Sequence, residues 1–378
     1  MMNKTYLFSG PGRTEIGGNH TDHQHGCVLA GAVDLEITAE VTINGTNTIR
    51  VYSDGYAPVE VDLRDLQPRE AEHATTTALV RGVAAAFARR GAQLQGIDAL
   101  VHSTVLPGSG LSSSAAFEVL LGTIFNELFF EAKLSAVEIA RIGQYAENVY
   151  FGKPCGLMDQ MASAVGGMVF IDFASPAKPC VEKLDFDFAK AGYALCIIDS
   201  GANHANLTDE YAAVTEELKM ICAFFGKEVL REIPEAEFIR KIPALRGKVP
   251  DRAILRAMHV YRENRRVQEQ VAALKENDVD RFLELVAESG RSSWMYLQNI
   301  LPTGAVAHQE VALALSLCDV FLQGRGAFRV HGGGFAGTVQ AFVPLDMLEA
   351  FKANVENCLG EGRCHVLRIR GQGGGRIK

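Results

Sequence analysis

The sequence predicts an α+β protein of two domains. Its 378 residues suffice for two domains of ordinary size with a large buried core. Segments with strand and helix patterns follow one another without the regular alternation that a parallel α/β sheet requires. Hydrophobic residues make up 48% of the chain and charged residues 22%, which is usual for a globular protein.

Seven segments have the residue pattern of strands. In chain order they are Cys27–Ile43, Ile97–Leu106, Gly167–Phe173, Tyr193–Ser200, Phe328–Gly332, Gly337–Val343 and Cys364–Arg370. A second run of strands and helices begins near Gly192, so we expect the domains to span residues 1–192 and 193–378.

Helices are expected between these strands. Ser135 and Glu138 have the spacing of a capping box at a helix start. Apolar residues recur at helical spacing from Leu207 onwards. Asp251–Asn277 and Asp278–Gly290 predict two further helices in the second half of the chain.

The charge, termini and cysteines exclude several classes of protein. A formal net charge of −8 argues against a nucleic acid or an anionic membrane as the main partner. The first residues lack the pattern of a signal peptide, and no apolar run reaches the roughly 20 residues of a membrane helix. The eight cysteines form no C-x-x-C pair and are expected to be free thiols in a reducing cytoplasm.

The first of three unusual stretches is GPGRTEIGGNHTDHQHG, Gly10–Gly26. His20, Asp22, His23 and His25 lie close enough in sequence to suggest a metal site. The alternative is a sugar or phosphate pocket built on a glycine-rich turn. Neither paired cysteine ligands nor an H-E-x-x-H helix accompanies the histidines, which disfavours the metal site.

The second stretch is VLPGSGLSSSAAFEVLLGTIFNELF, Val105–Phe129, in which a strand ends, a glycine turn follows and a helix begins. The first N–H groups of a helix have no partner within it and attract phosphate, which glycines allow to approach closely. Serine hydroxyls can add hydrogen bonds or bind Mg²⁺. The lysine of a P-loop and the third glycine of a dinucleotide-binding motif are absent. A plain turn with a serine N-cap is the alternative.

The third stretch is VHGGGFAGTVQAFV, Val330–Val343, in which three adjacent glycines separate two strands. Such glycines permit positive φ angles or a close approach of the backbone to another group. The alternative is a tight connection that serves packing only.

Together, and in this order, GPGRTEIGGNHTDHQHGCVLAGAVD, PGSGLSSSAA and GGGFAG resemble the three motifs of the GHMP kinases. Within that superfamily the chain is most similar to the galactokinase family, whose G-R-x-N-L-I-G-E-H-x-D-Y opening it matches at Gly12, Arg13, Gly18, His20 and Asp22. The resemblance runs over nearly the whole chain. It implies an N-terminal nucleotide- and sugar-binding domain, a C-terminal ferredoxin-like α/β domain, and ATP-dependent phosphorylation of the anomeric hydroxyl of galactose.

The resemblance assigns the reaction to Arg13 and Asp159. Asp159 becomes the catalytic aspartate beside the anomeric hydroxyl, and Arg13 keeps it ionised and stabilises charge on the transferring phosphoryl group. From the residues alone, the apolar neighbours of Asp159 are expected to raise its carboxyl pKa, which suits a proton acceptor. Whether Asp159 removes the proton or only orients the hydroxyl stays open, as does a role as helix N-cap.

The resemblance also assigns ATP and Mg²⁺ to the serine turn. Ser113 or Ser114 would lie near Mg²⁺ and the phosphates, with Ser114 and Glu147 as the metal ligands. Glu147 is expected late in a helix, where a carboxylate opposes the helix dipole. An ordinary solvated glutamate is the alternative. The nucleotide-binding residues would be Pro107, Gly108, Ser109, Gly110, Leu111, Ser112, Ser113, Ser114 and Ala115.

The sugar pocket follows from the same resemblance. Asp22 would meet the hydroxyls on the far side of the ring, and Asn19, His20, Tyr211 and the backbone at Gly156 would complete the pocket. Tyr211 also falls on the apolar face of its helix, so a core tyrosine is the alternative.

The chain departs from the family pattern at four positions. Glu15 replaces an asparagine, Gly17 an apolar residue, Asn19 a glutamate and His23 a tyrosine. In the family, the glutamate at this position meets the 6-hydroxyl of galactose. With Asn19 in its place, galactose can still be a substrate, with altered affinity. A sugar that bears a 6-carboxylate would no longer be repelled by a negative charge. The run DHQHG also resembles the D-H-Q-x-G of plant galacturonate kinases, and protonated histidines would add positive charge. Galacturonate or another galactose-like sugar is therefore the alternative substrate.

Two other classes of protein are alternatives to a kinase. A non-catalytic, sugar-sensing relative would lack parts of the catalytic set, whereas Arg13 and Asp159 are both present. A metalloprotein would use the histidine-rich stretch. The expected partners are a small-molecule sugar and ATP, and the expected state is a monomer or weak homodimer.

Overall fold

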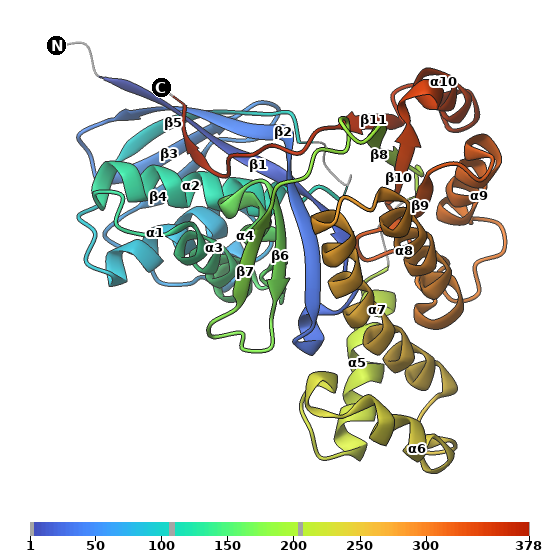
Figure 1. Ribbon diagram of the computed structural model, residues 1–378. Coiled ribbons are helices and arrows are strands. Elements are labelled where there is room, and N and C mark those ends of the chain that lie inside the picture. Colours follow the sequence, from blue (N-terminus) through green and yellow to red (C-terminus); the bar gives the residue numbers. More distant parts are fainter. Residues whose placement is uncertain (1–3, 106–109, 203–206, 378) are drawn as a thin grey trace.

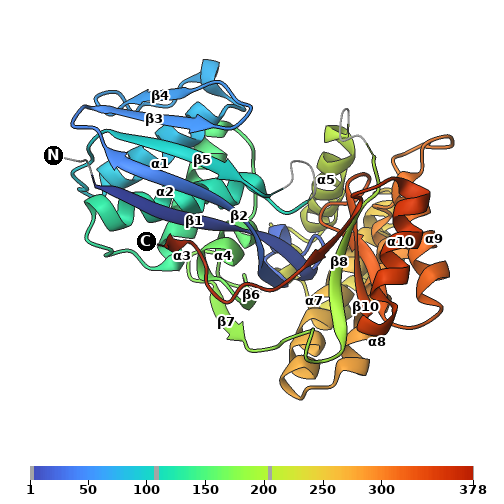
Figure 2. The same ribbon diagram turned by 90° about the horizontal axis from the view of Figure 1, so that it is seen from above.

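Two β-sheets organise the chain, and helices pack around both of them (Figure 1). The computed structural model describes residues 4–105, 110–202 and 207–377. Helices and strands both contribute to each half, as Figure 2 shows from above, so the expected α+β class is confirmed.

The larger sheet has eight strands within the described residues, in the order β12-β1-β2-β5-β3-β4, with β6 and β7 continuing from β2. Only β3 and β5 run parallel among these pairs. The strands are β1 Thr5–Gly17, β2 Cys27–Ile43, β3 Thr48–Ser53, β4 Val59–Asp62, β5 Ile97–Ser103, β6 Met168–Asp172, β7 Cys180–Leu184 and β12 Gly375–Arg376.

The smaller sheet is antiparallel throughout, in the order β11-β8-β10-β9. Its strands are β8 Tyr193–Asp199, β9 Ala327–His331, β10 Thr338–Pro344 and β11 Cys364–Leu367. It begins directly after Gly192, whereas the last strand of the chain, β12, returns to pair with β1 of the larger sheet. The division into residues 1–192 and 193–378 stays a prediction.

Helices fill the connections between the strands. α2 and α4 pack on β1 and β2, while α8, α9 and α10 pack on the smaller sheet. No helix in the described part of the chain is both long and apolar enough to cross a membrane. The helices are α1 Thr76–Arg89, α2 Ser113–Phe129, α3 Ala136–Tyr145, α4 Met158–Val165, α5 Thr208–Phe224, α6 Glu235–Leu245, α7 Asp251–Lys275, α8 Val279–Ser292, α9 Glu310–Leu322 and α10 Leu348–Leu359.

The helices and strands expected from the sequence are present, with small shifts at their ends. The capping box of Ser135 and Glu138 opens α3. The strand expected at Ile97–Leu106 ends at Ser103, and Leu106 lies outside the described residues. The strand expected to reach Arg370 ends at Leu367.

The glycine-rich stretch Gly10–Gly26 is not a turn over its whole length. Its first eight residues lie inside β1, which pairs with β2 through two bulges, one at Pro11 to Arg13 and one at Glu15 to Gly17. Glycines occur here because α2 crosses β1 closely: a Cβ at Gly10 would overlap the carbonyl oxygen of Ala116. A strand rather than a loop therefore carries Arg13.

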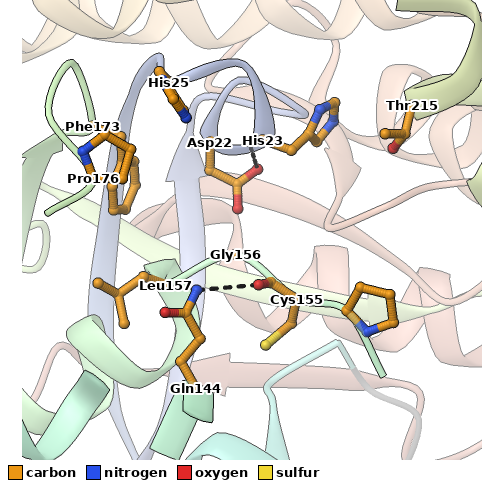
Figure 3. A pocket seen from close by; sticks show the side chains of 11 residues that line it. Asp22, His23, His25, Gln144, Cys155, Gly156, Leu157, Phe173, Pro176 and Thr215 are labelled. Atoms are coloured by element: carbon orange, nitrogen blue, oxygen red, sulfur yellow. Dashed lines mark hydrogen bonds between the residues drawn. The ribbon is translucent and has the colours of Figure 1, made fainter. Parts of the chain in front are cut away.

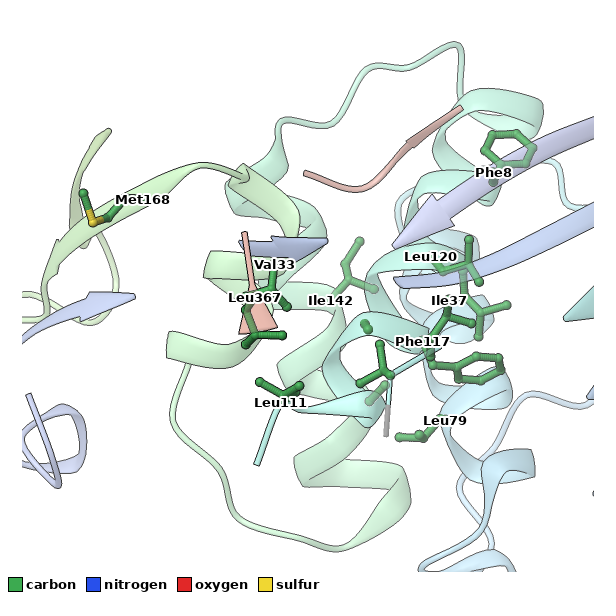
Figure 4. Close-up of a cluster of buried hydrophobic side chains, with 14 of the residues drawn as sticks. Phe8, Val33, Ile37, Leu79, Leu111, Phe117, Leu120, Ile142, Met168 and Leu367 are labelled. Atoms are coloured by element: carbon green, nitrogen blue, oxygen red, sulfur yellow. The ribbon is translucent and has the colours of Figure 1, made fainter. Parts of the chain in front are cut away.

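A single buried cluster extends from the larger sheet into the smaller one. Phe8, Leu120 and Phe117 fill the space between the larger sheet and α2 (Figure 4). The same cluster includes Phe282 and Phe342, whose ring centroids lie 5.2 Å apart in the second half. This shared core fixes the two sheets relative to each other, and so fixes the elements that form the site between them.

The close approach of α2 to β1 predicts the effect of one added methyl group. In Gly10→Ala the new Cβ meets backbone atoms of Ala116 and Leu120, so α2 must shift. We expect the free energy of unfolding to fall by about 1–3 kcal/mol, as measured by chemical denaturation. Gly371→Ala is the matched control, since nothing lies within 4 Å of a Cβ there. Equal stability of the two variants would contradict this packing.

Candidate active site

The three glycine-rich stretches meet at one place between the two sheets. The N–H of Arg13 in β1 donates to the carbonyl of Leu111, just before α2, at 3.0 Å. The imidazole of His20, in the loop after β1, bonds the carbonyl of Gly333 in the β9–β10 turn at 3.0 Å. The first, second and third stretches are therefore in contact, which their separation in sequence does not reveal.

Arg13 and Asp159 form a bidentate ion pair at this junction. Nε of Arg13 lies 2.7 Å from Oδ1 of Asp159, and Nη2 lies 2.8 Å from Oδ2. The remaining Nη1 donates to the carbonyl of Gly110, and the Ser112 hydroxyl donates to Oδ2 of the aspartate. Arg13 is buried, whereas the Asp159 side chain keeps 30% of its surface exposed. The carboxylate is thus fixed in orientation and still open on one side.

The pKa of Asp159 is lowered, which contradicts the expectation from its apolar neighbours. Burial does act to raise this pKa, but the charge and hydrogen bonds of Arg13 and the hydroxyl of Ser112 outweigh it. The pKa of Arg13 is raised in turn: burial lowers it, and Asp159 more than compensates. The carboxylate is consequently ionised at neutral pH.

Asp159 owes its position to the start of α4. It lies in the first turn of that helix, where the partial positive charge of the N–H groups favours a carboxylate. Leu157 occupies the N-cap position, so Asp159 is not the helix cap. The backbone therefore adds to the effect of Arg13 in holding the negative charge.

A second carboxylate, Glu147, lies beside the start of α2. The hydroxyl of Ser114 donates to its Oε1 at 3.2 Å, Lys153 Nζ lies 3.2 Å from the same oxygen, and Gln160 Nε2 donates to Oε2 at 2.8 Å. Glu147 sits in a π-helical turn, Ala146–Phe151, rather than in the last turn of α3, and only 3% of its surface is exposed. A solvated surface glutamate is excluded.

The hydroxyl of Ser114 and the carboxylate of Glu147 are a fitting donor set for Mg²⁺. Both supply hard oxygen atoms, lie next to each other, and adjoin the N-terminus of a 17-residue helix. Behind them Gln160 also donates to the buried Glu118 at 3.0 Å. Burial, followed by the charge of Glu147, raises the pKa of Glu118 well above its ordinary value.

The described part of the serine turn has the geometry of an anion site. Leu111 is fully buried and anchors it, and Ser112 adopts a left-handed backbone conformation as the N-cap of α2. Ser113, Ser114 and Ala115 form the first turn of that helix. The predicted residues Pro107, Gly108 and Ser109 lie outside the described residues.

A cavity of about 380 Å³ opens next to this junction (Figure 3). Asp22 projects into it, and a Cβ at Gly156 would overlap the Asp22 carboxylate, so glycine is needed for their close approach. Burial raises the pKa of Asp22 to about 6, although the N–H of His23 donates to its Oδ1 at 2.8 Å. The other residues that line the cavity are His23, His25, Gln144, Pro154, Cys155, Leu157, Phe173, Pro176 and Thr215.

The other predicted sugar ligands are not among the residues that line this cavity. Asn19 and His20 bond the carbonyls of Gly332 and Gly333, and the Tyr211 hydroxyl donates to the carbonyl of Gly334 at 2.9 Å. These contacts place Asn19, His20 and Tyr211 against the β9–β10 turn.

The histidines of the first stretch do not gather as metal ligands. The described residues contain no group of three or more His, Cys, Asp or Glu side chains able to hold a metal ion. Nδ1 of His20 instead faces Nε2 of His23 at 3.3 Å. Burial lowers the pKa of His23 to about 3, so this imidazole is neutral and adds no positive charge at physiological pH.

Several residues of the site carry no local sequence signal. Gln160 and Lys153 flank Glu147, and Gln144 lines the cavity. Each is a common polar residue whose role depends on distant partners. Gln160 directly follows Asp159 in the segment LMDQ.

Comparisons with known proteins agree with this geometry. Residues 78–167 match the model of the GHMP kinases N terminal domain, and residues 2–43 match the galactokinase galactose-binding signature. The chain is 34% identical over 347 residues to a galactokinase of Actinobacillus pleuropneumoniae, covering 90% of this chain and 85% of that protein. It is 33% identical to a galactokinase of Glaesserella parasuis serovar 5, strain SH0165, with 90% and 86% covered.

Solved structures resemble the fold as well. The crystal structure of Lactococcus lactis galactokinase complexed with galactose matches with a TM-score of 0.83 at 24% identity, covering 99% of this chain and 95% of that one. A mevalonate kinase structure matches with a TM-score of 0.68 at 13% identity, covering 97% and 99%.

The raised pKa of Asp22 predicts a pH dependence of stability. A carboxyl whose pKa is about 6 when folded and about 3.8 when unfolded stabilises the fold in its protonated form, and this contribution is lost as the pH rises through 6. Between pH 4 and 6, wild type should lose up to about 1.4 kcal/mol per pH unit relative to Asp22→Asn, whose amide does not titrate. Urea denaturation across this range measures it, and parallel curves for the two proteins would contradict it.

Proposed function

The chain belongs to the galactokinase family of the GHMP kinases, and on this premise we propose that it transfers the terminal phosphoryl group of ATP to the anomeric hydroxyl of galactose. The product is galactose 1-phosphate. One observation carries the proposal: Asp159, held by Arg13, is bonded to Ser112 at the N-terminus of α2 and follows Leu157, a residue of the cavity wall, by two positions. This is the arrangement that a sugar kinase needs.

The sugar occupies the cavity beside Asp22 and Gly156. Asp22 accepts hydrogen bonds from ring hydroxyls, and the absence of a side chain at Gly156 lets the backbone approach the sugar. His20 and Tyr211 complete the predicted substrate site from the side of the glycine turn, where Asn19 also lies.

Asp159 orients the attacking hydroxyl. Its lowered pKa keeps it ionised, so it can accept a hydrogen bond from the hydroxyl, but also makes it a weak base. Positioning therefore precedes proton acceptance, which occurs as the oxygen–phosphorus bond forms. Arg13 holds the carboxylate by two parallel hydrogen bonds, and its charge lies where the transferring phosphoryl group becomes more negative.

ATP and Mg²⁺ bind at the start of α2. The residues from Pro107 to Ala115, which include the first turn of α2 and its N–H groups, would hold the phosphates. Ser114 and Glu147 hold the cation, with Lys153 and Gln160 fixing the Glu147 carboxylate. When bound, Mg²⁺ neutralises charge on the phosphates.

The proposal also covers the binding partners of the protein and its place in the cell. A sugar and ATP are the ligands, neither nucleic acid nor membrane is a partner, and the protein acts in the cytoplasm as a monomer or weak homodimer. Residues 1–192 and 193–378 form its two domains.

Turnover on two sugars tests the substrate. Purified protein with ATP and Mg²⁺ should release ADP in the presence of galactose, and NMR of the product should place the phosphate on the anomeric oxygen. Galacturonate is assayed in parallel, because Asn19 carries no charge. If galacturonate is turned over faster than galactose, galacturonate is the substrate. If the protein binds both sugar and ATP but releases no ADP, it is a sensor and not a kinase.

Replacing the reactive carboxylate tests its role. In Asp159→Asn the amide keeps the shape but cannot accept the proton, so kcat should fall by at least about a hundredfold. Loss of the ion pair also leaves the buried Arg13 without its counter-ion, so the melting temperature is recorded to confirm that the variant folds. Asp185→Asn makes the same change at an exposed position and serves as control. Retention of most of kcat in folded Asp159→Asn would contradict the assignment.

A further inference from the structure

Asn19 and Glu15 form a buried pair at the junction of the two halves. They are 1% and 4% exposed, and Nδ2 of Asn19 donates to Oε1 of Glu15 at 3.2 Å. The same nitrogen donates to the carbonyl of Gly332, while Oδ1 accepts from Asn299 Nδ2 at 2.9 Å. Both hydrogens of the Asn19 amide are thus used within the protein, and none is left for a ligand.

The partners of Asn19 belong to the β9–β10 turn and to the segment that holds it. Asn299 donates to Gly333 O at 3.1 Å, the same carbonyl that His20 bonds. A Cβ at Gly334 would overlap the carbonyl of Asn299, so the turn passes directly against this segment. Asn19 therefore joins the loop after β1, which carries Asp22, to the glycine turn.

The carboxylate of Glu15 is compensated from the other sheet. Arg329 of β9 is fully buried and donates to Oε1 of Glu15 and, at 2.9 Å, to the carbonyl of Ile16. The carboxylate of Glu15 is thus paired with the guanidinium of Arg329 and the amide of Asn19, and all three side chains are buried. A second carboxylate there would face Glu15, whose charge already engages Arg329.

We propose that Asn19 is a positioning residue, which fixes the loop bearing His20 and Asp22 against the glycine turn through Glu15, Asn299 and Gly332, and that it touches no substrate. The readouts by turnover rest on the proposed function. The chain carries one carboxylate and one amide at positions 15 and 19, in the reverse order of the family pattern. Because Asn19 contacts Glu15, a glutamate at position 19 would place a second carboxylate against it.

An isosteric double-mutant cycle tests the pair. Asn19→Asp removes both donors and places a carboxylate against Glu15 and the carbonyl of Gly332. We expect KM for galactose to rise by about tenfold or more, since hydrogen bonds to a charged group are lost, while KM for ATP stays within about twofold. Adding Glu15→Gln removes the like-charge contact and restores a donor, but it also removes the ion pair with Arg329, so the single variant Glu15→Gln is measured as well. The losses in galactose KM and melting temperature in the double variant should be smaller than the sum of the losses in the two single variants.

A second sugar separates positioning from direct contact. If Asn19 met the 6-hydroxyl, as the sequence suggested, Asn19→Asp would impair galactose but leave 6-deoxygalactose unaffected. A positioning role impairs both sugars by the same factor. Asn354→Asp on the exposed face of α10 is the matched control and should change neither KM.

The outcomes separate this inference from the proposed function. Selective loss on galactose, or additive effects of the two substitutions on melting temperature, would overturn the positioning role. A lower melting temperature with unchanged KM for both sugars would reduce Asn19 to a structural residue and also overturn it. Wild-type protein that phosphorylates no sugar would refute the proposed function, whereas the melting-temperature cycle would still report the contact between positions 15 and 19.

Discussion

The need to neutralise one buried guanidinium constrains the whole site. Arg13 lies in the middle of β1, away from water, so its donors must find acceptors within the protein. It finds them on two other elements, the carboxylate of Asp159 at the start of α4 and the carbonyl of Gly110 before α2. These contacts fix the strand, the helix and the turn relative to one another. The carboxylate of Asp159 is therefore positioned by a requirement of folding.

Glycines make this packing of strand, helix and turn possible, because a residue without a side chain lets other groups come into contact with the backbone. A Cβ at Gly17 would overlap the side chain of Gln270, one at Gly110 would lie 3.0 Å from the imidazole of His331, and one at Gly333 would lie 2.7 Å from the ring of Tyr211. Each of the three glycine-rich stretches thus meets a side chain from a different part of the chain. Gly332 and Gly334 also adopt positive φ angles, which the turn between β9 and β10 requires.

The sequence predicted the fold class, most of the strands and the chemical nature of the site, because those depend on local patterns. It missed β1, since glycine and proline at Gly10 to Gly12 disfavour a strand unless a neighbour such as α2 demands their small size. It also misjudged the pKa of Asp159, because the effect of its apolar neighbours is local in sequence whereas Arg13 is 146 residues away. The contacts of Asn19 were unpredictable for the same reason: they join segments that only the folded chain brings together.

Three carboxyl groups around the site are held in different states by what lies next to them. The pKa of Asp159 is lowered because contact with a guanidinium outweighs burial, the pKa of Asp22 is raised to about 6 by burial, and the pKa of Glu118 is raised by burial and by the charge of Glu147. Glu147 itself faces the hydroxyl of Ser114 and the ammonium group of Lys153. The contact that stabilises Arg13 in the fold is also the one that keeps Asp159 ionised, so removing either partner impairs folding and chemistry together.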